Sequence, residues 1–204
     1  MKIAGIYLAA GNSSRMGTNK LALPIGTMTV GSLALEIVLK SSLDKVYIIT
    51  KDEDDAAWLP DEMKLDARCA FIKCPTAHKG QSESLHRGIE KAQADQMDAI
   101  LVILADQPFI TVQMLEEMIA CMKNNPTCRF VATIYEETIM PPVLFSASMY
   151  VELLKLHGDK GARAILQGDF LQKGKLLPCA DKRLVFDVDT NEDYLTLQSI
   201  KKTK

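Results

Sequence analysis

The sequence predicts an α/β fold, with a mainly parallel sheet in a three-layer α/β/α sandwich, and three features carry this prediction. Residues 99–105 (AILVILA) form a continuous aliphatic run, which is typical of a central parallel strand covered on both faces. A second apolar run, residues 3–10, ends directly in a loop that contains two glycines. Strand-like segments then alternate with helix-like segments along the chain. We therefore expect ligands to gather at the carboxyl ends of the strands.

The first half of the chain follows this alternation. Residues 30–40 carry apolar side chains at three- and four-residue spacing, which predicts a helix. Residues 45–50 and 70–73 are rich in β-branched and aromatic side chains, which predicts two strands, and the acidic segment 51–68 between them is expected to be irregular. A helix is predicted over 78–94, because glycine and serine near its start are typical of helix N-termini.

The second half continues the pattern after the central aliphatic run. A helix is predicted over 111–123, with Thr111 as its N-cap. The other elements expected here are a strand over 130–135, a helix over 146–156 that follows the segment 141–145, a short helix opening at 158–163, a strand over 184–188 and a helix over 191–201. The last helix has two acidic residues in its first turn, where the helix dipole favours negative charge.

Length and composition indicate one domain of ordinary size over residues 1–204. With 24 basic and 26 acidic residues, the net charge of −2 provides no general attraction to nucleic acid or to membrane surfaces. The five cysteines are odd in number and form no C-x-x-C pair, which favours reduced thiols and argues against a zinc site. We therefore expect a cytoplasmic protein that has neither nucleic acid nor a membrane as a partner.

The loop after residues 3–10 is the first candidate ligand site. It contains Gly11 and Gly17, and it places Arg15 and Lys20 with backbone N–H groups at the carboxyl edge of the sheet. This arrangement predicts a site for an anionic ligand such as a phosphate. Five residues separate the two glycines and Lys20 does not directly follow the second, so the loop is not a P-loop. The G-x-G-x-x-G fingerprint of dinucleotide-binding folds is also absent.

Three aspartates are candidates for binding a metal ion. Asp106 directly follows the central aliphatic run, so its carboxylate is expected at the same edge of the sheet. Asp187 and Asp189 lie two residues apart, and in an extended segment such residues face the same way. Mg²⁺ is bound in proteins by one or two carboxylates together with water and substrate phosphates. We therefore expect Asp106 to hold Mg²⁺ with Asp187 or Asp189, and favour Asp189 slightly.

Five motifs together resemble those of the nucleotidyltransferases of the molybdenum-cofactor family, especially its cytidylyltransferase branch. They are LAAGNSSRMGTNKLALPIG in the first loop, GQSESLHRG after the strand at 70–73, LADQP after the central run, GDKGAR at 158–163, and VFDVDTNEDY, in which Asn191 replaces the proline that is usual in the family. They occur in the family's order over almost the whole chain. The resemblance implies a Rossmann-like fold of the nucleotide-diphospho-sugar transferase type.

The resemblance also implies a role for each matching residue. The catalytic groups would be Lys20, Arg15 and Asp106, because cations and a metal ligand stabilise the charge that builds up on a triphosphate. The nucleotide-binding residues would be Leu8, Ala9, Ala10, Gly11, Ser13, Arg15, Gly17, Lys20, Gly80 and Ser84. A second, anionic substrate would be held by Lys160, Gly161 and Arg163. The metal ligands would be Asp106, Asp187 and Asp189.

The reaction implied by the resemblance is transfer of CMP from CTP to the terminal phosphate of molybdenum-molybdopterin, with release of pyrophosphate. The product would serve a recipient molybdenum hydroxylase such as xanthine dehydrogenase. CTP is expected rather than GTP because the guanylyl branch tends to carry a glycine where this chain has Ala10, whose Cβ narrows the base pocket. Two alternatives stay open. One is a guanylyl, sugar-phosphate or alcohol-phosphate transferase of the same fold, and the other is a non-catalytic carrier of the molybdenum cofactor.

Overall fold

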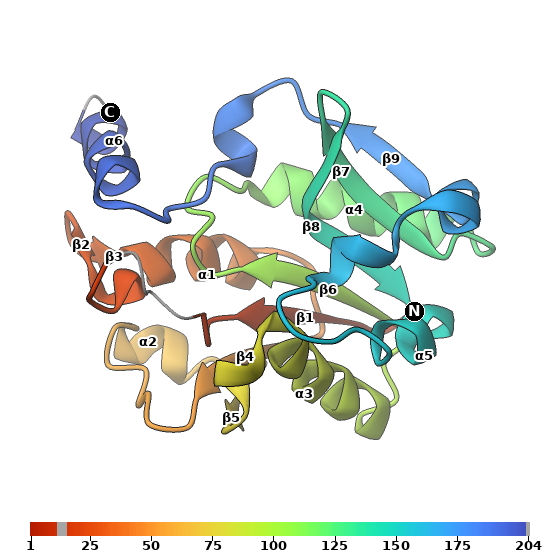
Figure 1. Ribbon diagram of the computed structural model, residues 1–204, viewed down its shortest axis with the longest axis horizontal. Helices are drawn as coiled ribbons and strands as arrows, with labels where there is room; N and C mark the ends of the chain where they lie inside the picture. The colour runs from red at the N-terminus through yellow and green to blue at the C-terminus, as the bar shows by residue number, and fades with distance from the viewer. Residues whose placement is uncertain (12–15, 203–204) are drawn as a thin grey trace.

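The computed structural model describes residues 1–11 and 16–202, and it places a seven-stranded sheet between two layers of helices (Figure 1). The strands of this sheet lie in the order β5-β4-β1-β6-β8-β7-β9. Their bounds are β1 (Ile3–Leu8), β4 (Lys45–Lys51), β5 (Cys69–Cys74), β6 (Ala99–Leu104), β7 (Phe130–Tyr135), β8 (Thr138–Ser146) and β9 (Lys175–Pro178). A separate two-stranded hairpin is formed by β2 (Pro24–Ile25) and β3 (Met28–Thr29).

Helices connect most of these strands. The α-helices are α1 (Val30–Lys40), α2 (Asp61–Lys64), α3 (Gln81–Ala94), α4 (Val112–Asn124), α5 (Tyr150–Leu153) and α6 (Asn191–Lys202). Short 3-10 helices are η1 (Lys20–Ala22), η2 (Ala77–Lys79), η3 (Ala147–Met149), η4 (Ala162–Ile165), η5 (Gly168–Lys173) and η6 (Lys182–Val185). Within the described residues, no helix is long and apolar enough to cross a membrane.

The sheet is mainly parallel, as the sequence predicts. Strands β5, β4, β1 and β6 run in one direction, and β7 and β9 run the same way, while β8 lies antiparallel between β6 and β7. The carboxyl ends of β1 and β6 are therefore neighbours, because Leu8 and Leu104 are register partners. This places the segment after Leu8 beside the segment that begins with Asp106.

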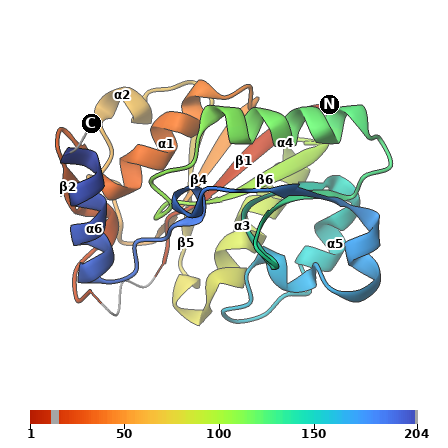
Figure 2. The same ribbon diagram turned by 90° about the horizontal axis from the view of Figure 1, so that it is seen from above.

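The two faces of the sheet have separate cores, and each is covered by its own helices (Figure 2). Successive residues of β1 alternate between them, as the geometry of a strand requires. Ile3 and Tyr7 pack on one face with α1 and α4, whereas Ala4 and Ile6 pack on the other with α3 and α5. The strand is buried along its whole length, which explains its unbroken apolar run.

The helix starts agree with local sequence chemistry. Thr29 caps α1 in a capping box, because its side chain accepts a hydrogen bond from the Ser32 backbone and Ser32 in turn caps Thr29. Thr111 caps α4 by accepting a hydrogen bond from the backbone N–H of Met114 at 3.2 Å, which confirms the predicted cap. Gly80 is the N-cap of α3, so this helix begins slightly later than predicted.

Two predictions for the second half of the chain are wrong. Residues 184–188 do not form a strand, since the chain makes the turn η6 there and the last strand of the sheet is β9. The Asp181 side chain caps this turn by accepting a hydrogen bond from the backbone N–H of Arg183 at 3.0 Å. In addition, the helix expected over 146–156 is shorter and is divided into η3 and α5, which together cover 147–153.

Strand β8 was not predicted from the sequence, because it contains two adjacent prolines. Pro141 and Pro142 fall where the register between β7 and β8 shifts, from Ala132 opposite Val143 to Thr133 opposite Met140. A proline cannot donate a ladder hydrogen bond, and a bulge is one of the few places in a sheet where this is tolerated.

Candidate active site

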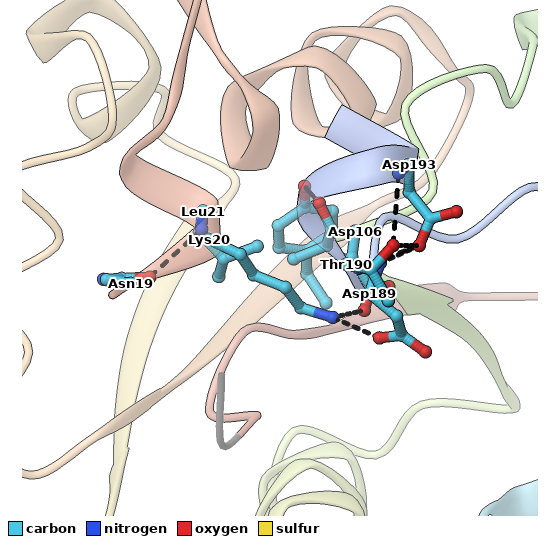
Figure 3. Close-up of polar contacts among 9 residues, drawn as sticks. Asn19, Lys20, Leu21, Asp106, Asp189, Thr190 and Asp193 are labelled. Carbon is cyan, nitrogen blue, oxygen red and sulfur yellow. Dashed lines mark hydrogen bonds and ion pairs between the residues drawn. The ribbon is translucent and has the colours of Figure 1, made fainter. Parts of the chain in front are cut away.

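Lys20 lies at the centre of the candidate site, where it joins two acidic segments (Figure 3). Its ammonium donates to Oδ2 of Asp106 at 2.5 Å and to Oδ1 of Asp189 at 2.7 Å. Lys20 starts η1, and the Asn19 side chain caps this turn by accepting a hydrogen bond from the Leu21 backbone at 3.1 Å. Three segments far apart in the sequence thus meet at one buried ammonium group.

The two carboxylates keep this ammonium charged. Lys20 is only 8% exposed, and burial by itself lowers the pKa of a lysine. The attraction and hydrogen bonds of Asp106 and Asp189 outweigh the burial, and the pKa of Lys20 is raised. Lys20 is therefore a fixed positive charge at the carboxyl edge of the sheet.

Asp106 and Asp187 bring a second, unneutralised set of oxygens to the same place. The backbone N–H of Val188 donates to the Asp106 carbonyl at 3.0 Å, which holds the two acidic segments side by side. In the described part of the chain, Oδ1 of Asp106 and Oδ1 of Asp187 are both buried and find no hydrogen-bond partner. Burial and the negative charge of Asp106 raise the pKa of Asp187 to about 6.

These oxygens fit a divalent cation. Buried carboxylate oxygens without a donor are costly, and a hard cation is the ligand that compensates them best. Among residues 1–11 and 16–202, no group of three or more His, Cys, Asp or Glu side chains is arranged to hold a metal by itself. Mg²⁺ does not need such a group, because it is commonly bound by one or two carboxylates with water and phosphates. Asp106 together with Asp187 or Asp189 therefore meets the chemical requirement.

A cavity of about 340 Å³ opens beside this cluster. The predicted nucleotide-binding residues that line it are Leu8, Ala10, Gly11, Gly80 and Ser84, and Asp106 closes one side. Its wall is made by the carboxyl ends of β1 and β6 and by the start of α3, so the fold places it where parallel sheets bind ligands.

A second cavity, of about 280 Å³, lies against the first. It is lined by Gly161 and Arg163 from the predicted second-substrate segment and by all three candidate metal ligands. The two cavities share five lining residues, namely Leu8, Gln81, Leu104, Asp106 and Asp159. Two ligands bound in these cavities would meet at Asp106.

Glycines allow the start of α3 and the 158–161 loop to approach closely. Gly80 has φ +130°, and a Cβ placed on it would lie 2.2 Å from the carbonyl carbon of Gly158. The backbone N–H of Ser82 donates to the Gly158 carbonyl at 3.0 Å, which fastens the 158–161 loop to the start of α3. A Cβ on Gly161 would lie 2.5 Å from Oε1 of Gln81. The nucleotide and second-substrate motifs are thus in direct contact.

The remaining predicted residues lie less close to the cavities. Ala9 packs in the core beneath the sheet edge, Gly17 forms an exposed turn with φ +67°, and Lys160 is exposed outside the lining of both cavities. Ser13 and Arg15 lie outside the described residues.

Sequence reasoning missed several lining residues, and the polar ones among them are Gln81 and Asp159. Both belong to both cavities, and both directly follow a glycine inside a motif that the sequence analysis had recognised. Their positions next to Gly80 and Gly158 could have identified them, because residues that flank a close backbone contact lie near the same surface.

Comparison with known proteins gives a consistent answer. The family described as the MobA-like NTP transferase domain matches residues 5–175. The purine catabolism protein PucB of Bacillus subtilis (strain 168) is 34% identical over 196 residues, which cover 94% of each chain.

Solved structures agree with the fold. Rv0371c from Mycobacterium tuberculosis H37Rv is 26% identical and has a TM-score of 0.78. The match covers 98% of this chain and 99% of the Rv0371c chain. The same mycobacterial protein is also known as a complex with manganese. Molybdopterin-guanine dinucleotide biosynthesis protein A from Archaeoglobus fulgidus has a TM-score of 0.66 at 20% identity, with complete coverage of both chains, and shows likeness of fold alone.

Proposed function

Because this chain belongs to the MobA-like NTP transferase domain family, we propose that it transfers CMP from CTP to the terminal phosphate of molybdenum-molybdopterin. Membership makes it a nucleotidyltransferase, and the choice of CTP and of the acceptor are the steps that we add. PucB is named as a purine catabolism protein, which supports a purine-oxidising molybdenum hydroxylase as the recipient of the product. The resemblance of the five sequence motifs to those of the molybdenum-cofactor nucleotidyltransferases supports molybdopterin as the acceptor.

One observation carries the proposal, namely the meeting of the two cavities at Asp106. A nucleotidyl transfer requires a triphosphate and a phosphate acceptor to be held in contact, with positive charge beside the phosphorus that is attacked. The first cavity would hold the nucleotide and the second the acceptor, and the Lys20 ammonium lies 2.5 Å from Oδ2 of the aspartate that they share. A non-catalytic carrier would have no need for this arrangement.

The reaction needs no protein nucleophile. An oxygen of the acceptor phosphate forms a bond to the α-phosphorus of CTP, and the bond from that phosphorus to the bridging oxygen breaks, so that its electron pair leaves with pyrophosphate. Lys20 lines neither cavity, but its ammonium contacts Asp106 and would supply positive charge beside the phosphate oxygens as their negative charge grows. Mg²⁺, held by Asp106 with Asp187 or Asp189, would supply further positive charge to the triphosphate. The close contact between Gly80 and Gly158 would hold the nucleotide-binding and second-substrate motifs together.

The test is pyrophosphate release by the purified protein with Mg²⁺ and molybdenum cofactor, with CTP, GTP and ATP offered separately. We expect release with CTP and loss of release in Asp106→Ala. Glu192→Ala is a matched control, because this exposed acidic residue lies near the site in sequence but lines neither cavity. Release with GTP alone, or with a sugar phosphate in place of the molybdenum cofactor, would replace the proposed substrate while keeping the reaction class. No release with any nucleotide or acceptor would refute the enzymatic proposal.

A further inference from the structure

We infer that Asp193 is a positioning residue of this site, because its carboxylate fixes the backbone that carries Asp189. Oδ2 of Asp193 accepts a hydrogen bond from the backbone N–H of Asp189 at 3.1 Å and another from the backbone N–H of Thr190 at 2.8 Å. The same oxygen accepts a third hydrogen bond from the Thr190 hydroxyl at 2.8 Å (Figure 3). One oxygen therefore holds three donors on the segment that presents Asp189 to Lys20.

Asp189 needs such a tether because its own side chain is weakly enclosed. The Asp189 side chain is 48% exposed, whereas the side chains of its partner Lys20 and of Asp106 are 11% and 19% exposed. Packing thus holds Lys20 and Asp106 in place but contributes much less to Asp189. The 2.7 Å contact between Asp189 and the Lys20 ammonium consequently depends on where the backbone at 189 is held.

Asp193 can act as a tether because it is itself anchored. Its backbone N–H donates to Oγ1 of Thr190 at 3.2 Å, so the two residues cap the start of α6 reciprocally. One residue further on, the hydroxyl of Tyr194 donates to the Pro24 carbonyl at 2.7 Å, and Leu197 is buried against the β2–β3 hairpin. This hairpin directly follows η1, which begins with Lys20. Asp193 therefore joins Asp189 to a helix that is docked next to Lys20.

The chain offers variants that separate positioning from helix capping. Asp193→Ala removes every hydrogen bond of the carboxylate, whereas Asp193→Asn keeps one oxygen that can accept from the two backbone N–H groups but carries no charge. Thr190→Ala removes the hydroxyl that caps α6 but leaves the two backbone N–H groups bound to Asp193. We expect both alanine variants to lose part of the cap and to lower Tm by about 2–4 °C.

Only Asp193→Ala should also affect the chemistry. Hydrogen bonds to a charged acceptor are strong, so we expect kcat with CTP and molybdenum cofactor to fall about 10-fold or more in Asp193→Ala, with a smaller change in KM. Thr190→Ala keeps both backbone donors on Asp193, so it should lower kcat by less than about threefold, and Asp193→Asn, which keeps a neutral acceptor, should recover part of the kcat lost in Asp193→Ala. Equal kcat in the two alanine variants would overturn the inference.

The kinetic comparison rests on the proposed function. We therefore add a second measurement that is independent of that function. The NMR signal of the Lys20 ammonium, assigned by its loss in Lys20→Met, reports directly on the contact with Asp189. We expect Asp193→Ala to shift this signal in the same direction as Asp189→Asn, and Thr190→Ala to leave it in place. If the unmodified protein releases no pyrophosphate, the proposed function fails and the ammonium signal alone decides. Equal signals in Asp193→Ala and the unmodified protein would then overturn the positioning role.

Discussion

Replacing Lys20 with methionine tests the central ion pair most directly. Lys20→Met keeps an unbranched side chain of similar length but removes the ammonium that lies 2.5 Å from Asp106 and 2.7 Å from Asp189. Asp106 is then left without the donor to its Oδ2, and its other carboxylate oxygen, Oδ1, is already buried without a partner among the described residues. We expect the variant to be less stable than the unmodified protein.

The size of the loss follows from the burial of each pair. The side chains of Lys20 and Asp106 are 11% and 19% exposed, and removal of one partner of a buried pair costs about 3–5 kcal/mol. The contact with the more exposed Asp189 adds about 1 kcal/mol or less. Because Asp106 retains some contact with water, we expect a total near the lower limit, about 3 kcal/mol, which corresponds to a fall in Tm of about 6–12 °C.

Urea unfolding of four proteins gives a double-mutant cycle: the unmodified protein, Lys20→Met, Asp106→Asn and the double variant. The double variant should recover part of the stability lost in Lys20→Met, because the charge of Asp106 is removed together with its partner. We expect a coupling free energy of about 1.5 kcal/mol or more between the two sites. Coupling within about 0.5 kcal/mol of zero would refute the ion pair as described.

Three further predictions concern other parts of the fold. Gly80→Ala should greatly reduce nucleotide binding measured by calorimetry. The new Cβ would lie 2.2 Å from the Gly158 backbone, and the φ of +130° at Gly80 disfavours a residue with a Cβ. Unchanged binding would contradict the direct contact. Ala10→Gly should relax the choice between CTP and GTP, since Ala10 lines the 340 Å³ cavity, and an unaltered ratio of kcat/KM values would remove this explanation of base selectivity. Hydrogen bonds from Lys91 and from a tyrosine hydroxyl lower the pKa of Asp95. The contribution of Asp95 to stability is therefore present above about pH 4 and is lost as the pH falls through its folded pKa. In thermal scans between pH 7 and pH 3, the difference in Tm between the unmodified protein and Asp95→Asn should shrink as the pH falls.

The parts of the fold that sequence reasoning found are those specified by local patterns. The unbroken aliphatic run at 99–105 identified β6 because a strand covered on both faces has no polar side to alternate with. The cap at Thr111 located the start of α4, since capping depends on residues within one turn. In the site, Lys20 and Asp106 could be singled out because each directly follows a recognisable strand-and-loop pattern.

Other features depended on contacts between distant segments. The sequence favoured Asp189 only slightly over Asp187. In the structure, Asp189 contacts Lys20 across 169 residues, whereas Asp187 is half-buried and has one oxygen without a described partner. A strand was expected over 184–188, but the chain turns there.

The sequence by itself therefore determined the α/β class, most of the strands and helices, and the residue types that gather at the sheet edge. Only the tertiary structure decided that two adjacent prolines belong to β8, that the cavities share Gln81 and Asp159, and that Asp193 holds the backbone of Asp189. The physical reason is the range of the interactions. Apolar periodicity and caps act within a few residues, whereas strand pairing, a shared cavity wall and an ion pair are fixed only when distant segments have been brought together by the packed cores.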